Sequence, residues 1–362
     1  MVAGGLAWSG ESIWLLPMAL ILPMTLSLSH TWGTAFLGAL FYFLGSLWPI
    51  IPGATAFFEQ DSAWNGTILW FAWAVLLALP FAAVGLVSNH VRAFVALLVI
   101  LLQSLLPVGI ASPVVAAGVL FPTMGVFGIL GISALILSLL QRSTWTIGLI
   151  TITVVLAISI SFGTRSSMPG WTSHDTHFLP RSDYAWTQYE RLMKMVDINK
   201  RSGAVVSVFP ENVIPGWIDP VSEQMTQTTL HAFMPITHTL VFGAEKVTRT
   251  GRIPVVLARG HNEAEYVVRV PVPIAEWGRD VPLRMFGPGT VRIEGVQAGV
   301  LLCYEQLLVF PVLRSMYDGA DVLIAPSNLY WANRCTISKA QDVCVRSWAR
   351  LFNVPYYRAV NR

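Results

Sequence analysis

The first 163 residues are almost without charge. The only Asp, Glu, Lys or Arg residues in this segment are Glu11, Glu59, Asp61, Arg92 and Arg142. The whole chain is 54% hydrophobic and 12% charged, whereas about a quarter of the residues of a water-soluble domain are charged. So many apolar side chains without charges require lipid as their solvent. We therefore expect residues 1–163 to form a membrane domain.

Six stretches in this half approach the roughly 20 apolar residues that a spanning helix needs. They lie near residues 12–29, 33–52, 67–87, 93–111, 122–141 and 144–163. Arg92 and Arg142 fall in the loops after the third and fifth stretches, and basic loops tend to stay in the cytoplasm. With an even number of spans, everything after residue 163 lies outside. This predicts a multi-pass protein of the bacterial inner membrane with a periplasmic C-terminal domain.

Residues 164–182 are a polar stretch containing proline, glycine and serine, and we predict a linker there. His174 and His177 flank Asp175 and raise the question of a metal site. No further ligand lies at a recognised spacing. The prediction is therefore a solvated hinge and no metal.

From residue 183 the pattern alternates between helices and strands, which indicates a layered α/β domain. Glu211, Cys303 and Asn328 each follow an apolar strand-like run, and catalytic groups gather at the carboxyl ends of such strands. A cysteine and a carboxylate at one sheet edge suit nucleophilic acyl transfer. A cysteine after an apolar run is also commonly a buried core residue. The pattern alone leaves both readings open.

Five ordered segments add a resemblance to this pattern. They are VVSVFPENVIP, VPVPIAEW, GVLLCYE, LIAPSNLYW and RSWARLFNVPYYRAVN, and together they cover roughly residues 183–362. They resemble the nitrilase (carbon–nitrogen hydrolase) superfamily. With a multi-span half in front, the chain is similar to the superfamily's membrane-bound N-acyltransferases and to a related family of conjugal-transfer proteins.

The resemblance implies an α-β-β-α layered fold and assigns roles to residues. Cys303 matches the nucleophile, Glu211 the general base and Glu276 a supporting glutamate. The residues that match substrate-contacting positions are Tyr304, Glu305, Asn328, Trp331 and Trp186, the last of which is equally compatible with ordinary packing. The family needs no cofactor. Its implied partners are the membrane, a lipid or membrane-associated acyl substrate and the conjugation machinery, without direct nucleic-acid binding.

The chain departs from the family in two respects. The family has a lysine eight residues before the second glutamate, where its ammonium stabilises the oxyanion. Here that position is Val268, with Arg269 beside it as a substitute cation and Lys246 as a more distant alternative. A guanidinium does not replace an ammonium conservatively. The domain is also shortened at its C-terminus relative to the family.

Two functions remain open at this point. In the first, the outer domain is a cysteine-dependent acyltransferase or amide hydrolase that works through a thioester at the periplasmic membrane surface. In the second, it is a catalytically idle scaffold anchored in the membrane as part of a conjugation apparatus. The Glu211–Cys303 pair favours the enzyme and the missing lysine favours the scaffold. A solute transporter is disfavoured, because ionisable residues mark most ion pathways and the spans hold almost none.

Overall fold

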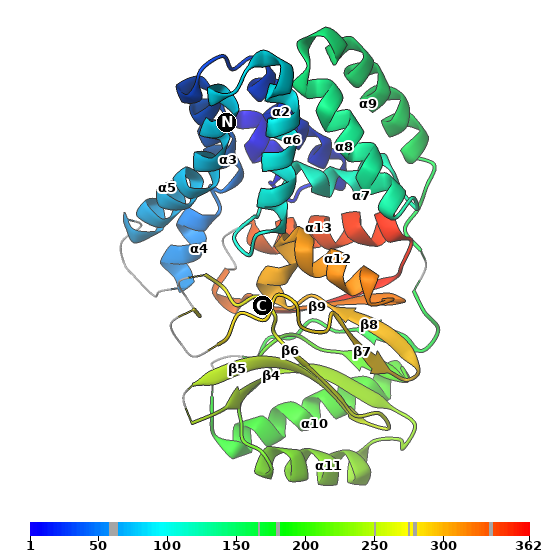
Figure 1. Ribbon diagram of the computed structural model, residues 1–362. Helices are drawn as coiled ribbons and strands as arrows, with labels where there is room; N and C mark the ends of the chain where they lie inside the picture. The colour runs from blue at the N-terminus through cyan, green and yellow to red at the C-terminus, as the bar shows by residue number, and fades with distance from the viewer. Residues whose placement is uncertain are drawn as a thin grey trace. The chain divides into compact units, whose positions relative to one another are not determined.

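A computed structural model of the chain divides into two compact units (Figure 1). The structure describes residues 1–57, 64–165, 167–178, 182–249, 251–273, 276–277, 281–332 and 336–362. The helical unit comprises Met1–Arg165, Leu307–Phe310 and Arg334–Asn353. The α/β unit comprises Ser166–Gln306, Pro311–Asn333 and Val354–Arg362. The predicted loop charges Glu59 and Asp61 lie outside the described residues.

The helical unit is built from short α-helices and 3₁₀ segments. In chain order they are α1 (Val2–Ala7), η1 (Ile13–Leu20), α2 (Ile21–Ser27), α3 (Trp32–Ser46), α4 (Ile50–Phe57), α5 (Trp64–Ala78), η2 (Leu79–Leu86), α6 (Asn89–Leu105), η3 (Pro113–Ala116), α7 (Ala117–Leu120), α8 (Val126–Leu140), η4 (Arg142–Thr144), α9 (Trp145–Ser159) and α13 (Ile337–Phe352). Each of the six predicted stretches contains helix.

Fewer than six of these helices have the length of a membrane span. In the described part of the chain, Trp64–Leu86 and Arg142–Ser159 are long and apolar enough to cross a membrane. A third candidate is α3 with the start of α4, bent by 52°. The other apolar helices, Ile13–Ser27, Asn89–Leu105 and Val126–Leu140, are shorter. The prediction of six full spans is therefore not supported by helix length.

The segment between α6 and α8 explains part of this difference. Helix α6 ends before Pro107, which has no backbone donor. The chain then runs through η3 and α7, and residues 109–120 are buried within the unit. The Ser104 and Ser112 hydroxyls share a hydrogen bond of 2.5 Å there. The irregular backbone of this segment is therefore buried within protein rather than continued as a long helix.

Helix α13 belongs to the helical unit, although the sequence assigned it to the C-terminal domain. The Ser347 hydroxyl donates to the Val115 carbonyl at 2.5 Å, and the Arg350 guanidinium donates to the Ser159 carbonyl at 2.9 Å. Backbone N–H groups of Thr123 and Gly125 donate to the carbonyls of Arg350 and Leu351. These two bonds satisfy carbonyls at the helix C-terminus that have no partner within the helix.

The α/β unit contains two sheets (Figure 1). The first sheet has the order β1-β2-β4-β5-β6, with β3 paired to β4; the second has the order β10-β9-β8-β7. The strands are β1 (Trp171–Ser173), β2 (Val206–Val208), β3 (Ile214–Trp217), β4 (Thr239–Val247), β5 (Arg252–Gly260), β6 (Ala264–Val267), β7 (Thr290–Ile293), β8 (Val296–Val300), β9 (Val322–Asn328) and β10 (Tyr356–Asn361). The remaining elements are α10 (Ala185–Ser202), α11 (Val221–Phe233), η5 (Cys303–Leu307), α12 (Val309–Tyr317) and η6 (Tyr330–Ala332).

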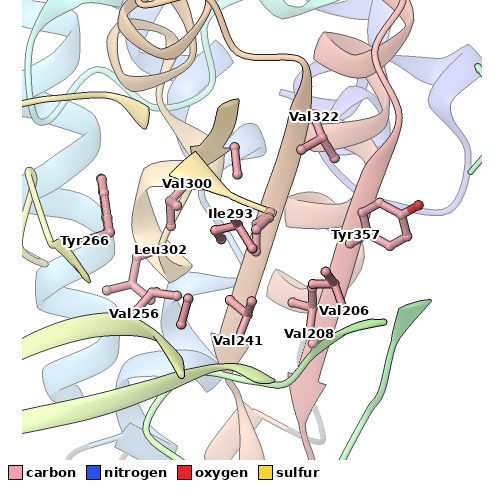
Figure 2. Packing of buried hydrophobic residues seen from close by; sticks show 14 of the residues in the cluster. Val206, Val208, Val241, Val256, Tyr266, Ile293, Val300, Leu302, Val322 and Tyr357 are labelled. Atoms are coloured by element: carbon pink, nitrogen blue, oxygen red, sulfur yellow. The ribbon is translucent and has the colours of Figure 1, made fainter. Parts of the chain in front are cut away.

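Alternating side chains of the first sheet face two different cores. On β4, Val241 joins a cluster with Val300, Val322 and Tyr357 of the second sheet (Figure 2). Its neighbour Leu240 joins the core formed with α10 and α11, which cover the outer face of β4 and β5 (Figure 1). Because successive strand residues point to opposite faces, an apolar run here fills both layers. The layered α/β arrangement is as predicted from residue 183 onward.

The predicted linker is partly incorporated into the α/β unit. Strand β1 pairs in parallel with β2, and Thr176 forms a bridge with Asn361 of β10. The three residues that had suggested a metal site contact protein groups, and Arg362 pairs with Asp175 as well as contacting His177. His174 stacks on Phe209 and contacts the Ser207 hydroxyl, Asp175 accepts from the Val360 N–H, and His177 contacts the Arg362 carbonyl.

Candidate active site

Cys303 lies directly after the strand β8 run, at the start of η5. Its side chain is half-buried, and its backbone φ is +42°. An L-residue rarely adopts this left-handed conformation, and such positions cluster at functional sites. The thiol is therefore held on a sharp turn rather than sealed in the core.

Glu211 follows strand β2 and meets Cys303. The Cys303 thiol is hydrogen-bonded to the Glu211 carboxyl. The carboxylate Oε2 also accepts from the backbone N–H of Asn328, at 2.9 Å. Strand β2 lies in the first sheet, and β8 and β9 lie in the second. Their ends bring together Glu211, Cys303 and Asn328, the three residues that the sequence places at strand ends.

A glycine on the neighbouring strand makes room for the Glu211 backbone. A Cβ at Gly243 of β4 would lie 2.4 Å from the Glu211 Cα. The Gly243 N–H donates to the Pro210 carbonyl, and the Val213 N–H donates to the Gly243 carbonyl. The backbone around Glu211 therefore packs directly on β4 and is hydrogen-bonded to it. A side chain at position 243 would collide with the Glu211 backbone.

The environment of Glu211 disfavours its charged form. Burial, together with the nearby carboxylate of Glu276, raises the pKa of Glu211 to about 8. The hydrogen bonds from Asn328 and Cys303 act in the opposite direction. Glu211 is thus poised near neutral pH, as is typical of a proton-transferring residue.

Glu276 is positioned by its own loop. Its carboxylate Oε2 accepts from the Val272 N–H at 2.7 Å, and its N–H donates to the Val272 carbonyl at 3.0 Å. Val268, at the position where the family has lysine, is buried in the core between the two sheets. The loop therefore presents the second glutamate but places an aliphatic side chain at the lysine position.

The structure corrects the predicted role of Arg269. Its side chain is 1% exposed. The guanidinium donates to the Tyr266 hydroxyl at 2.7 Å, to the carbonyls of Val300 and Pro311 and to the Ser315 hydroxyl. All three of its nitrogens are engaged by buried acceptors. Arg269 is a scaffold residue in this structure rather than a cation held ready for an oxyanion.

Glu305 is the acidic partner of this scaffold, so it is also not a substrate contact as predicted. It is fully buried. Its carboxylate accepts from the N–H groups of Arg269, Val270 and Leu302 at 2.8–3.0 Å and from the Tyr266 hydroxyl at 2.7 Å. Glu305 therefore joins the loop after β6 to the turn that carries Cys303. Burial of such a charge requires pairing of this kind.

Lys246, the alternative cation, is occupied elsewhere. Its ammonium lies 2.6 Å from Glu265 and 3.0 Å from Asp219. These partners raise the pKa of Lys246 above its usual range although burial lowers it. Lys246 therefore belongs to an ion-pair cluster with Glu265 and Asp219, and among the described residues it is not paired with Glu211.

The other predicted substrate contacts have different surroundings. Tyr304 is buried, and this burial raises its pKa. Asn328 lies beside Glu211, and the Trp331 indole donates to the Asn328 carbonyl at 3.1 Å. Trp186 is 68% exposed, and its ring centroid lies 5.6 Å from that of Tyr189, so burial in the core does not account for it. Substrate contact by Asn328, Trp331 and Trp186 remains a proposal.

Two residues next to the site were given no role from the sequence. Tyr266 bonds both Glu305 and Arg269, and Gly243 makes room for Glu211. The only available signal for Tyr266 was its place two residues before Val268. Gly243 lies within a run of strand residues and carries no signal in the sequence.

Comparison with known proteins extends over the whole chain. No protein-family profile matches it. It is 29% identical over 380 aligned residues to the "Probable conjugal transfer protein TraB" of Sinorhizobium fredii, covering 100% of this chain and 96% of the relative. It is 27% identical to the conjugal transfer protein TraB of Agrobacterium fabrum, covering 100% and 91%.

Similar solved structures cover part of the chain at low identity. An amidase of the nitrilase superfamily from Nesterenkonia sp. AN1 shares 15% identity with a TM-score of 0.35, covering 44% of this chain and 64% of the amidase. A carbon–nitrogen hydrolase from Helicobacter pylori shares 11% identity with a TM-score of 0.34, covering 44% and 59%. This chain thus spans less than two thirds of those enzymes. The predicted resemblance to conjugal-transfer proteins is confirmed: the chain is similar over its full length to TraB conjugal transfer proteins.

Proposed function

We propose that this protein is a membrane-anchored, cysteine-dependent acyltransferase or amide hydrolase of the carbon–nitrogen hydrolase type. The observation that carries this proposal is the hydrogen bond between the Cys303 thiol and the Glu211 carboxyl, at a turn where Cys303 has φ of +42°. A buried filler cysteine has no need of a strained backbone or of a carboxyl partner. A nucleophile needs both presentation and a base.

The first half-reaction forms a thioester. The ionised Glu211 carboxylate takes the proton from the Cys303 thiol, and the sulfur attacks the carbonyl carbon of an amide or ester. The tetrahedral species collapses as Glu211 returns the proton to the departing amine or alcohol. In the second half-reaction an amine or water attacks the thioester, Glu211 accepts its proton, and the thiol is regenerated by that proton as the acyl product leaves.

Support for the oxyanion differs from the family's arrangement. Val268 replaces the lysine, and Arg269 donates to other groups. The loss of one oxyanion donor typically lowers the rate about 100- to 1000-fold. We therefore propose slow turnover, with the backbone of the Cys303 turn and Glu276 shaping the site.

The apolar helical unit supports a membrane-borne substrate. Helix α9 buries only Gly148 and Ser159, and its exposed side chains include Ile147, Ile150, Val154 and Ile158. A surface of this kind is suited to lipid contact. We propose an inner-membrane location with the α/β unit on the periplasmic side, and a role in plasmid conjugal transfer in keeping with the similarity to TraB.

The test is turnover by the full chain in membranes. Phospholipid with a labelled acyl chain and a short water-soluble acyl amide serve as alternative donors, and release or transfer of the acyl group to a primary amine is measured. We expect product with the native chain and none with Cys303→Ala. Cys344→Ala is the matched control, because Cys344 is fully buried in α13. Equal product formation by the native chain and Cys303→Ala would exclude the proposed enzyme.

A catalytically idle scaffold is the second candidate. The observation that favours it is the burial of Val268 in the core at the lysine position. In that case the native chain and Cys303→Ala support conjugal transfer equally in a mating assay, and neither forms product.

A further inference from the structure

Asn361, at the end of β10, connects several segments around the site. It is 2% exposed. Its Oδ1 accepts from the Thr176 hydroxyl and from the Phe178 N–H, both at 2.8 Å. Its Nδ2 donates to the Phe178 carbonyl at 3.2 Å and to the Asn328 Oδ1 at 3.0 Å. One amide thus fills two acceptor and two donor positions.

The partner Asn328 leads directly to the site. Asn328 and Asn361 are register partners at the ends of β9 and β10. The Asn361 carbonyl also accepts from the Leu329 N–H at 2.9 Å. The Asn328 backbone N–H donates to the Glu211 carboxylate at 2.9 Å. Asn361 is thus hydrogen-bonded through its side chain to Asn328 and through its main chain to Leu329. Asn328 in turn donates to the Glu211 carboxylate.

We propose that Asn361 is a positioning residue that fixes the Glu211 carboxyl through Asn328, using the 176–178 segment as its anchor. The inference rests on the proposed role of Glu211 as the base for Cys303. Asparagine is required for this arrangement, because aspartate offers no donor for the Asn328 and Phe178 oxygens. An aspartate would place a charge against the Asn328 oxygen and release the end of β9.

A hydrogen bond to the ionised carboxyl favours that form, so loss of the Asn328 contact makes Glu211 harder to ionise. The bond from Asn328 is one of the contacts that lower the pKa of Glu211. A purely structural asparagine would change the stability of the fold without moving this ionisation. The two roles can therefore be separated by a pH profile.

The experiment measures the alkylation rate of Cys303 by iodoacetamide between pH 6 and pH 10, with the full chain in membranes and readout by peptide mass spectrometry. The variants are Asn361→Asp and the milder Thr176→Val, which removes one donor to Asn361 without changing the side-chain shape. The matched control is Asn199→Asp. Asn199 is also fully buried and hydrogen-bonded to the Ala204 carbonyl, Ser207 and His238, and in the part of the chain that the structure describes none of these partners is hydrogen-bonded to Glu211.

In the native chain we expect a midpoint set by the ionisation of Glu211, which Glu211→Gln removes so that only the rise due to ionisation of the thiol itself remains. Asn361→Asp should move it upward by about one pH unit, so that alkylation at pH 7 is about tenfold slower. Thr176→Val should shift it less in the same direction, and Asn199→Asp should leave it unchanged. If the native chain lacks a midpoint dependent on Glu211, the proposed function itself fails. If the midpoint is present but the profile of Asn361→Asp overlays the native profile, the positioning role is overturned and the proposed function stands. Thr176→Val is read in the same way if Asn361→Asp does not fold.

Discussion

Cys303 and Glu211 form a pair whose chemistry depends on which of them holds the proton. The thiol is half-buried and the carboxyl lies next to a second carboxylate, Glu276. Two neighbouring carboxylates resist double ionisation, so one retains its proton to higher pH. In the Cys303–Glu211 pair, the Glu211 carboxyl is therefore mostly protonated at pH 7.

The rate of acyl transfer from Cys303 should rise with pH. The base form of Glu211 is the carboxylate, and burial raises the pKa of Glu211 to about 8. About a tenth of the molecules are then ionised at pH 7 and most at pH 9, so the rate should increase roughly tenfold across this range. A pH–rate profile of thioester formation checks this. A flat profile, or one that falls through pH 8, would contradict the assignment of Glu211 as base.

Restoring the family lysine should accelerate the reaction. Val268→Lys would introduce an ammonium at the position that matches the family's lysine, and one added oxyanion donor is worth about 100- to 1000-fold in rate. The measurement is thioester formation by full-length protein, with Val268→Met as the uncharged control of similar length. Because Val268 is buried, thermal unfolding of both variants must be compared. Equal rates for lysine and methionine would show that the missing charge does not limit this site.

At the scale of single residues, the sequence predicts which residues follow strands, but it does not predict which charged side chains form ion pairs. Glu211, Cys303 and Asn328 follow apolar runs, and the structure brings them together. The sequence suggests Arg269 as a substitute cation but does not show that its ion-pair partner is Glu305, 36 positions away in the chain. Ion pairing between distant residues depends on tertiary packing, which periodicity does not encode.

Strand β4 has a glycine, Gly243, where the Glu211 backbone packs against it. In Gly243→Ala the added Cβ would lie 2.4 Å from the Glu211 Cα, and backbone atoms cannot move aside cheaply. We expect a loss of about 1–3 kcal/mol in stability and a marked drop in Cys303 acylation. Gly33→Ala is the control, since no atom lies within 4 Å of its added Cβ. Native-like acylation by Gly243→Ala would contradict the close packing of Glu211 on β4.

A short turn inside a long apolar run is hard to recognise from sequence. Residues 290–304 form one continuous strand-like run in the sequence, but in the structure they contain the antiparallel pair β7 and β8. The turn between them is Glu294-Gly295, and both residues have positive φ. Two-residue hairpins use this geometry, although Asn-Gly or Asp-Gly signals it more strongly in sequence.

On the scale of the whole molecule, helix α13 follows the candidate site in the sequence but packs within the helical unit. A Cβ at Gly118 of α7 would lie 1.7 Å from the Ser347 carbonyl oxygen of α13. Gly118→Ala should therefore force α7 and α13 apart and lower the thermal unfolding temperature of the full chain. Gly38→Ala is the control in the same unit, because its nearest atoms lie at 3.7 Å. Equal unfolding temperatures would show that the two helices do not pack this closely.

The sequence could not predict this placement of α13. Residues 336–352 have the pattern of an amphipathic helix, which specifies that one face is buried but not against which partner. The bonds of Ser347 and Arg350 to carbonyls of the helical unit decide the question. The domain boundary at residue 163 was therefore predicted from composition, whereas the return of the chain to the helical unit was not.

The proposed enzyme depends on Cys303 acting as a nucleophile that Glu211 activates. The most direct measurement is intact and peptide mass spectrometry of the full chain in membranes after incubation with an activated octanoyl ester. We predict one hydroxylamine-labile octanoyl adduct on Cys303, absent in Cys303→Ala and formed about 100-fold or more slowly in Glu211→Gln. A native chain whose Cys303 remains unacylated, or is acylated equally fast in Glu211→Gln, would contradict the account.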